Sequence, residues 1–281
     1  MPSLRPGFSP RERIRRLRLY YKSFDLFRRA FTNSSRALWF PFFGNGEFFL
    51  AHLPASVRIP RDYWTMLPTV ARLALAGARP EWAGDRLRIS FDDVTLVSPP
   101  GGKMIGTSYK EIFVDDVYRI MNRDLTGVTV VDVGAYIGDS SIAFARRGAR
   151  VHAFEPDPVF HRYLQDNIRL NRLEDRITAH PVGLSDRNIS VGDIALVEAI
   201  SYLRSCHITH ADIVKMDCEG CEYDLFRDAR LIEFLKPDDV ILEYHRGGGL
   251  LRDFFVNLGF SVDWPERVDP VGYLYVQRDP R

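Results

Sequence analysis

Residues 130–140, with the sequence VVDVGAYIGDS, constrain the fold of this chain more than any other segment. The run of valines predicts a buried strand, and Gly134 and Gly138 predict a tight turn from that strand into a helix. Glycines at such a turn allow the backbone to approach a ligand closely. The segment therefore predicts the first strand, turn and helix of an α/β sheet that binds a ligand at its carboxyl edge.

Strand and helix patterns alternate along the rest of the chain. We predict strands at residues 128–133, 151–154, 177–182, 213–216 and 240–244, and helices at residues 110–121, 140–147, 157–171 and 250–258. This alternation indicates a mostly parallel sheet that is covered by helices on both faces. Residues 260–264 and 273–277 predict a closing hairpin, which requires an antiparallel strand. The predicted fold class is therefore α/β, a Rossmann-like sheet that closes on an antiparallel hairpin.

The amino-terminal part of the chain differs from the rest in charge. Residues 1–90 hold 16 Lys and Arg against 6 Asp and Glu, whereas residues 91–281 hold 22 against 31. Ser9 and Pro10 predict the start of a basic amphipathic helix, with Ile14, Leu17, Tyr21 and Phe24 at helical spacing. We expect two parts: a basic, aromatic extension over residues 1–85, and a catalytic domain over residues 86–281 that begins with a hairpin at 86–91 and 94–97.

The composition indicates a reducing compartment. Three cysteines in 281 residues form no disulfide framework. Cys218 and Cys221 have the C-x-x-C spacing of redox and zinc sites, but no second Cys or His pair accompanies them, so we assign them neither role. No early segment predicts a signal peptide or a membrane-spanning helix. We expect a cytoplasmic protein, in which residues 9–31 either contact an anionic membrane surface or pack on the chain's own catalytic domain.

A carboxylate at the end of the second predicted strand indicates a nucleoside ligand. Glu155 follows Gly134 by 21 residues, the position from which an acid in Rossmann-type sheets accepts hydrogen bonds from ribose hydroxyls. A dinucleotide fingerprint requires a glycine where this chain has Tyr136, so a pyrophosphate would meet a bulky ring. S-adenosylmethionine carries no phosphate and suits the looser turn, which Asp132 precedes. We therefore favour adenosylmethionine over NAD.

A second polar cluster follows the fourth and fifth predicted strands. It consists of Asp217, Glu219, Glu222, Glu243 and His245. Methyl transfer requires an oriented acceptor and benefits from a base that removes the acceptor's proton. We therefore assign Asp217, Glu219 and His245 as candidate catalytic residues. Two alternatives remain open: the carboxylates could hold a divalent cation, although we assign no metal ligand, and Glu222 could merely favour the start of a helix.

Several spaced motifs resemble the FkbM family of methyltransferases. These motifs are EIFVDDVYRI at residues 111–120, VVDVGAYIGDSS at 130–141, VHAFEPDP at 151–158, DNIRLN at 166–171 and DIVKMDCEGCEYDLF at 212–226. The resemblance implies a class I methyltransferase fold, adenosylmethionine as the cofactor, and O-methylation of a hydroxyl on a sugar or small metabolite. Tyr136 departs from the small or amide residue expected at its position.

The resemblance also implies which residues bind the cofactor. Gly134, Ala135 and Gly138 would line the methionine end, and Glu155 would bind the ribose. The full set that we assign to the cofactor is Asp132, Gly134, Ala135, Tyr136, Gly138, Ser140, Glu155, Pro156 and Asp157.

Three other functions compete with methylation of a small molecule or glycan. A nucleic-acid methyltransferase is the first, because the basic extension also carries Tyr20, Tyr21, Trp39 and Phe42, which could stack on bases. The acidic catalytic domain would repel a polyanion, so we do not expect nucleic acid as a partner. The other two are a protein that binds adenosylmethionine without catalysis, and a nicotinamide dehydrogenase.

Overall fold

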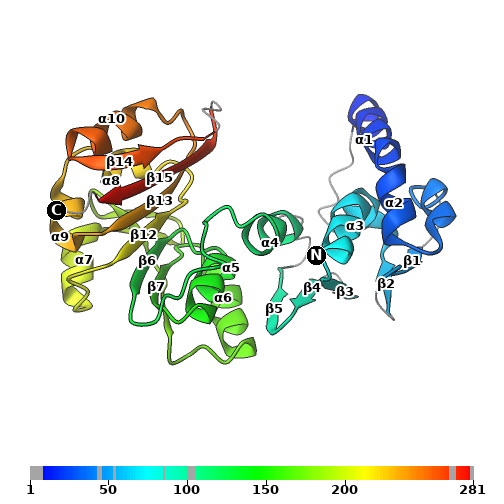
Figure 1. Cartoon of the computed structure of the whole chain (residues 1–281), viewed down its shortest axis with the longest axis horizontal. Coiled ribbons are helices and arrows are strands. Elements are labelled where there is room, and N and C mark those ends of the chain that lie inside the picture. Colours follow the sequence, from blue (N-terminus) through cyan, green and yellow to red (C-terminus); the bar gives the residue numbers. More distant parts are fainter. Residues whose placement is uncertain are drawn as a thin grey trace. The chain divides into compact units, whose positions relative to one another are not determined.

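The computed structural model describes residues 9–42, 46–52, 55–84, 86–99, 105–265 and 270–278. The chain forms two compact units, Met1–Val114 and Asp115–Arg281 (Figure 1). The boundary expected near residue 85 lies inside the first unit, between β3 (Arg79–Ala83) and β4 (Arg86–Phe91), which pair antiparallel. The predicted hairpin therefore forms, as β4 and β5 (Val94–Val97), but it belongs to the first unit.

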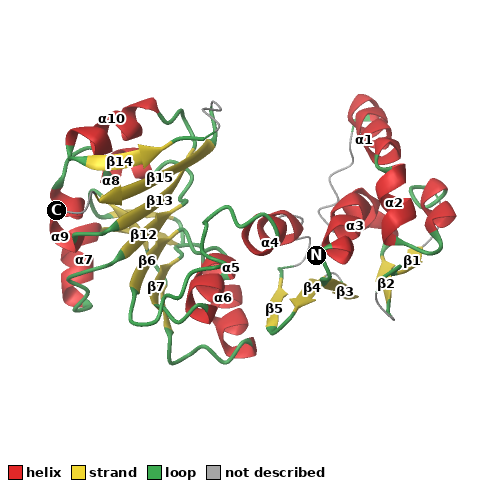
Figure 2. Ribbon diagram, viewed as in Figure 1, coloured by secondary structure: helices red, strands yellow, loops and turns green. Residues whose placement is uncertain are grey.

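A seven-stranded sheet forms the centre of the second unit, with helices on both of its faces (Figure 2). Its strands are β6 (Thr129–Val133), β7 (Arg150–Phe154), β8 (Ile177–His180), β12 (Ile213–Met216), β13 (Asp239–Tyr244), β14 (Phe260–Asp263) and β15 (Gly272–Arg278). The strand order is β14-β15-β13-β12-β6-β7-β8, and β15 runs antiparallel to both of its neighbours. This is the sheet of the class I methyltransferase fold, so the predicted fold class is confirmed.

The helices of the second unit are α5 (Asp139–Arg146), α6 (Pro158–Leu170), α7 (Ala199–Ser205), α8 (Glu222–Leu225), α9 (Arg230–Leu235) and α10 (Gly249–Asn257). Local sequence explains where several of them begin. The Asp157 carboxylate accepts hydrogen bonds from the backbone N–H groups of Val159 and Phe160, so it caps α6 at the start of the predicted range 157–171. A small sheet of β9 (Gly183–Ser185), β10 (Ile189–Val191) and β11 (Ile194–Glu198) precedes α7 and was not predicted.

The helix predicted at residues 110–121 is displaced toward the amino terminus. The structure has α4 at Ile105–Phe113 instead. Asp116 and Arg119 have φ angles of 49° and 56°, which a continuing right-handed helix does not allow. The Asp116 carboxylate also accepts hydrogen bonds from the backbone N–H groups of Ile120 and Met121. This local bonding replaces the helix with a loop.

The first unit has a core of its own, which is rich in aromatic side chains. Its remaining elements are α1 (Pro10–Lys22), α2 (Phe24–Ala30), α3 (Leu67–Leu75), the 3₁₀ turns η1 (Ser34–Leu38) and η2 (Arg61–Met66), and the hairpin β1 (Gly46–Phe49) and β2 (Ser56–Ile59). Ser9 caps α1 as predicted. Tyr20 is the buried residue of α1, whereas Ile14 and Tyr21 are 52% and 37% exposed, so the predicted apolar face is rotated. None of the helices in the described residues is long and apolar enough to cross a membrane.

Candidate functional site

The turn between β6 and α5 is tied to both neighbouring strands. The N–H groups of Gly134 and Ala135 both donate to the carbonyl of Phe154, at the end of β7. Gly134 has a φ of +81°, and a Cβ added to it would lie 1.8 Å from the carbonyl oxygen of Asp217. Glycine is therefore required here, both for its backbone conformation and for the close approach. The contact places the predicted cofactor turn directly against the loop that follows β12.

Glu155 is oriented by two backbone groups at the end of β7. Its Oε2 accepts a hydrogen bond from the N–H of Tyr136 at 2.9 Å, and its Oε1 accepts one from the N–H of Asp157 at 2.8 Å. Burial raises the pKa of Glu155 to about 7. Each carboxylate oxygen has a second lone pair, so the group can accept from two neighbouring hydroxyls. This arrangement fits the ribose of a nucleoside.

Two of the residues assigned to the cofactor instead support the turn from inside the protein. Asp132 is fully buried, and its Oδ2 accepts hydrogen bonds of 2.6 Å from the hydroxyls of Ser140 and Ser141. Its Oδ1 lies 3.0 Å from Nζ of Lys215. The side chains of Asp132 and Ser140 are thus already bonded within the protein, which is a different role from the one expected for them.

The other residues assigned to the cofactor lie on or beside the turn. Asp157 acts on Glu155 through its backbone N–H, while its side chain caps α6. Pro156 is half-buried next to Gly183. The remaining members come together around the β6–α5 turn: Gly134, Ala135, Tyr136, Gly138 and Glu155. Their contact with a cofactor stays a prediction.

Lys215 is a buried cation that we did not predict. It is 1% exposed, and its ammonium group donates to the carbonyl of Gly134 at 2.8 Å. Burial alone would lower the pKa of Lys215, but the carboxylates of Asp132 and Asp217 raise it above its ordinary value. The side chain therefore stays charged and ties the turn to β12. The sequence does carry a signal that could have identified Lys215. It is a lysine inside the otherwise apolar strand IVKM, and a buried charge requires a partner.

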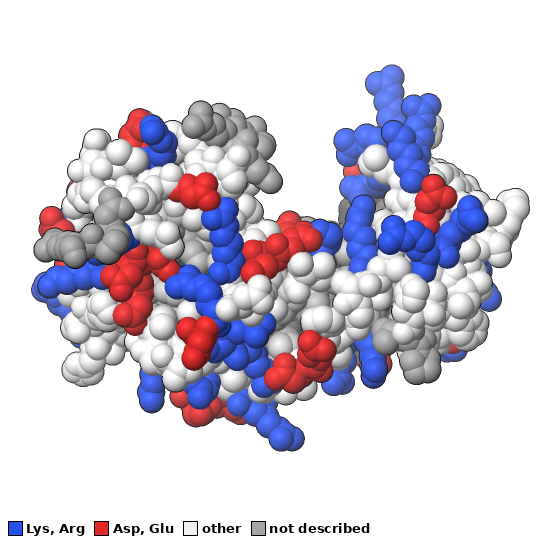
Figure 3. Space-filling view, in the orientation of Figure 1, with Lys and Arg blue, Asp and Glu red and all other residues white. Residues whose placement is uncertain are grey.

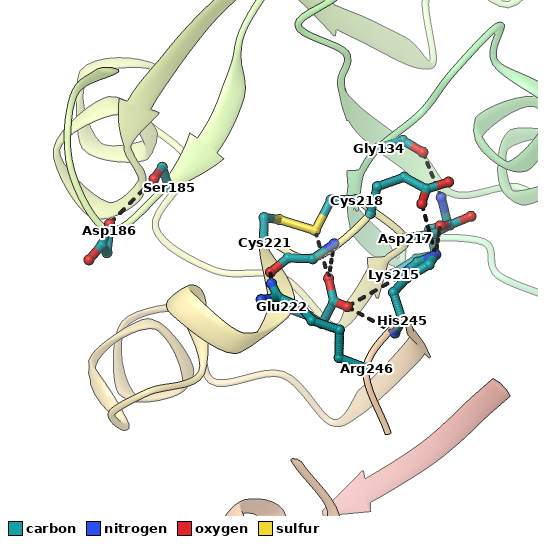
Figure 4. Close-up of a disulfide and its surroundings, with 12 residues drawn as sticks. Gly134, Ser185, Asp186, Lys215, Asp217, Cys218, Cys221, Glu222, His245 and Arg246 are labelled. Atoms are coloured by element: carbon teal, nitrogen blue, oxygen red, sulfur yellow. Dashed lines mark hydrogen bonds and ion pairs between the residues drawn. A yellow bond between two sulfur atoms is a disulfide. The ribbon is translucent and has the colours of Figure 1, made fainter. Parts of the chain in front are cut away.

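The three predicted catalytic residues lie together at the carboxyl ends of β12 and β13. Asp217 and His245 face each other in Figure 4. Nε2 of His245 lies 3.6 Å from Oδ1 of Asp217 and 3.6 Å from Oε2 of Glu219. The side chain of Glu219 is 86% exposed, whereas that of His245 is 13% exposed. Asp217 and His245 therefore form the sheltered part of the cluster, and Glu219 forms its rim.

Glu222 holds His245 from the opposite side. Its carboxylate is fully buried and lies 3.2 Å from Nδ1 of His245. It also accepts hydrogen bonds from the backbone N–H groups of Gly220 and His245. Burial would raise the pKa of Glu222, but the hydrogen bonds from His245 lower it below its ordinary value. Glu222 does begin α8, but its side chain serves His245 as well as the helix.

Two groups of the cluster have pKa values close to neutrality. The hydrogen bond with Glu222 is the largest influence that raises the pKa of His245 to about 8. Burial, and then the charge of Asp217, raise the pKa of Glu243 to about 7. The ligand atoms of Asp217, Glu243 and His245 lie within 4.8 Å of one another. Protonated His245 supplies a positive charge between these carboxylates. The same three side chains could instead hold a metal ion, which is the alternative that the sequence left open. The arrangement can exchange a proton near neutral pH.

A disulfide joins Cys218 and Cys221 within the same loop (Figure 4). The sequence predicts no redox role for this pair, so the bond is an unexpected feature. Cys206 is free, and the single bond spans three residues of sequence, so it is a local link rather than a framework. It encloses Glu219 and Gly220, which have φ angles of 57° and 122°. The disulfide thus fixes the segment that connects Asp217 to Glu222.

Residues 107–207 match the model of the TRM5/TYW2 methyltransferase domain. The chain is 32% identical over 114 residues to the ribosomal protein L11 methyltransferase of Anoxybacillus flavithermus, covering 40% of this chain and 36% of that protein. It is 43% identical over 60 residues to the tRNA (guanine(37)-N(1))-methyltransferase of Danio rerio, covering 21% of this chain and 12% of that protein. The solved ribosomal protein L11 methylase of Lactobacillus delbrueckii subsp. bulgaricus is 18% identical, with a TM-score of 0.43. That similarity covers 61% of this chain and 79% of the solved chain.

These matches confirm part of the sequence prediction and correct the rest. The matched domain is a methyltransferase domain of the adenosylmethionine-dependent class, as predicted. The predicted FkbM family is wrong, because the family model that matches is a different one. The expectation that nucleic acid is not a partner is also wrong, because a tRNA methyltransferase is among the relatives. O-methylation of a sugar or small metabolite finds no support in these matches. The membrane contact expected for residues 9–31 finds no support. The chain spans about a third or less of the length of these curated relatives.

Proposed function

We propose that this chain transfers the methyl group of adenosylmethionine to a ring nitrogen of an RNA base. One observation carries the proposal: His245, held by Glu222, lies beside Asp217 in the loop that packs against the cofactor turn at Gly134. A ring nitrogen that still carries its proton is a weak nucleophile, and a positioned base corrects this. The base and the cofactor turn lie at the same edge of the sheet, where open α/β sheets bind their ligands.

Each group of the site then has a specific task. Adenosylmethionine, when bound, supplies an electrophilic methyl group on a sulfonium. Glu155 would hold its ribose, and the backbone at residues 134–138 would hold its amino acid end. Because the Glu222 carboxylate accepts a hydrogen bond from Nδ1–H, neutral His245 has its lone pair on Nε2. Nε2 takes the proton from the acceptor nitrogen, and Asp217 stabilises the imidazolium that results.

The charge of the first unit supports RNA as the acceptor. Figure 3 shows Lys and Arg side chains gathered over α1. Arg11, Arg15 and Arg18 are exposed and recur at helical spacing, on the side of α1 opposite the buried Tyr20. A row of cations of this kind binds phosphate groups. Trp39 is 64% exposed in the same unit, and an exposed ring of this size can stack on a base.

Transfer of a labelled methyl group tests the proposal. The full chain is incubated with methyl-tritiated adenosylmethionine and, in separate reactions, with total tRNA or with ribosomal proteins. We expect label in the RNA, and a loss of about a hundredfold or more for His245→Gln. His52→Gln, an exposed histidine of the first unit, is the matched control and should transfer at the wild-type rate.

Label in the ribosomal proteins and none in the RNA would overturn the proposal. It would favour instead the protein acceptor that the name of the Anoxybacillus flavithermus relative describes.

A further inference from the structure

The Cys218–Cys221 disulfide lies between two acidic residues of the candidate site. Asp217 directly precedes the pair and Glu222 directly follows it (Figure 4). Both cysteines are half-buried rather than enclosed in the core, so a small reductant can reach a sulfur atom. A change in this bond therefore occurs where it can affect the residues that hold His245.

We propose that Cys218–Cys221 is a thiol–disulfide exchange site, opened by a dithiol reductant, whose state sets the position of Gly220 and Glu222 and so the hydrogen bond to His245. The proposal goes beyond methyl transfer and does not depend on the identity of the acceptor.

The first argument is the contact between a sulfur atom and the carboxylate. Sγ of Cys218 lies 3.4 Å from Oε2 of Glu222, while Oε1 of the same carboxylate faces His245. A disulfide sulfur carries no proton and donates no hydrogen bond, whereas a thiol is a weak donor. Reduction therefore adds a donor to Oε2. Charge drawn toward Oε2 weakens the hydrogen bond that Oε1 accepts from His245.

The second argument is the backbone that the disulfide encloses. Glu219 has a φ of 57°, a left-handed conformation that residues other than glycine adopt rarely. Such a conformation persists only while the surrounding structure enforces it. The neighbouring Gly220 donates its N–H to Oε2 of Glu222 at 2.8 Å, and its carbonyl accepts from Arg246. Once the cross-link opens, Glu219 is free to relax, and both hydrogen bonds of Gly220 change with it.

The charged groups that face His245 come from three elements. Asp217 and Glu219 belong to the loop after β12, Glu222 begins α8, and Glu243 belongs to β13. Glu222 is the one among these four for which the structure shows a contact with sulfur. The effect of reduction on His245 is therefore expected to pass through Glu222.

The exchange balances with a dithiol as the electron donor. A thiolate of the reductant attacks one sulfur of the pair, which forms a mixed disulfide and releases the other cysteine as a thiolate that takes up a proton. The second thiol of the reductant then attacks the mixed disulfide and releases the second cysteine. The two protons and two electrons of the dithiol end on Cys218 and Cys221, and the reductant leaves as its own disulfide.

The test uses full-length Cys206→Ser, in which Cys218 and Cys221 are the remaining cysteines. The protein is equilibrated with mixtures of reduced and oxidised dithiothreitol, and its thiols are alkylated and counted by mass. We expect no free thiol at the oxidising end and two at the reducing end, reversibly and without unfolding by circular dichroism. In the reduced protein, NMR should show a shifted Nδ1 resonance of His245 and faster hydrogen exchange at the N–H of Gly220.

A triple variant that adds Cys218→Ala and Cys221→Ala is the control, and its NMR spectrum should not respond to dithiothreitol. If that variant fails to fold, Cys206→Ser with Cys221→Ser should match the reduced protein under both conditions. Two free thiols in oxidised dithiothreitol would overturn the proposal. Identical His245 and Gly220 signals in the two redox states would overturn it as well.

Discussion

Nδ1 of His245 lies 3.2 Å from Oε1 of Glu222, and the Glu222 side chain is fully buried. The two residues are 23 positions apart in sequence and come from different elements, so the contact joins the end of β13 to the start of α8. A buried carboxylate on one nitrogen fixes the tautomer and orientation of the ring. The other nitrogen is thereby presented to Asp217.

Replacing Glu222 by glutamine should move the pH dependence of the reaction. The carboxylate raises the pKa of His245 to about 8, and a neutral amide removes the charge that favours the imidazolium. The proposed mechanism uses neutral His245 as the base, so kcat/KM should rise with pH, and the midpoint of that rise should fall in Glu222→Gln. The profile of kcat/KM against pH, together with an NMR titration of His245, measures this shift. An unchanged midpoint would show that Glu222 does not act on His245.

The same pair makes a pH-dependent contribution to stability. The folded pKa of His245 lies above its ordinary value of 6.5, so the contribution is fully present below about pH 6.5. It is lost as the pH rises through about 8. The free energy of unfolding of the wild type, measured in urea, should therefore decrease between pH 6 and pH 9. The decrease should be smaller in Glu222→Gln. Equal decreases in the two proteins would contradict the pairing.

Two glycines with similar positive φ angles should respond differently to alanine. Gly127 has a φ of +84° with no atom within 4 Å of an added Cβ, whereas the Cβ at Gly134 would meet Asp217 at 1.8 Å. Gly127→Ala should lower the free energy of unfolding by about 1–2 kcal/mol, because alanine disfavours the left-handed conformation. Gly134→Ala should lower it by about 1–3 kcal/mol more, because the new Cβ overlaps the carbonyl oxygen of Asp217. It should also weaken cofactor binding. Urea unfolding and calorimetry measure both effects, and equal costs would refute the close approach.

The buried ion pair can be tested by a double-mutant cycle. Lys215→Met leaves Asp132 buried without its cation and should destabilise the fold by about 3–5 kcal/mol. Adding Asp132→Asn should leave the double variant more stable than the sum of the single effects, by about 0.5–3 kcal/mol. Denaturant unfolding of the wild type, the two single variants and the double variant gives the coupling free energy between Lys215 and Asp132. Additive effects would mean that the two charges do not interact.

The parallel sheet was predictable from the sequence because its strands are short apolar runs between turn residues. The strand β12 was predicted with its observed ends, and the N-cap of α6 followed from Asp157 and Pro158. The segment from β9 to α7 was missed, because its β-strands are mostly half-buried and lack a clear period. There, α7 begins where the Glu198 side chain accepts from the N–H of Ser201, a cap that lies outside the preferred residue types.

The site was predicted in outline because strand ends converge at one edge of the sheet. Asp217 and His245 could be expected to meet on that ground alone. The partners of Lys215 and Glu222 could not, because they come from distant segments: the bond from Lys215 to Gly134 spans 81 positions. Burial of both side chains makes these contacts decisive for the site, and burial depends on tertiary packing that local pattern does not encode.

The exposed cationic face of α1 should govern how RNA binding depends on salt. Each phosphate contact contributes about one unit to the slope of log K against log salt concentration. Replacing Arg11, Arg15 and Arg18 by glutamine should therefore reduce that slope by about two to three units. The same change at Arg72, Arg79 and Arg88, which are exposed in the same unit, is the matched control. Equal slopes for the two triple variants would place the RNA elsewhere.

Calorimetric titration with adenosylmethionine tests the cofactor site, on which the methyl-transfer mechanism depends. The wild type should bind this ligand in preference to NAD. Glu155→Ala should weaken binding at least about tenfold, because it removes hydrogen bonds to a charged group worth about 1.5–3 kcal/mol. Glu174→Ala, which removes an exposed carboxylate of the same unit, should leave the affinity unchanged. Binding of NAD in place of adenosylmethionine, or equal affinity in the two variants, would contradict the assignment.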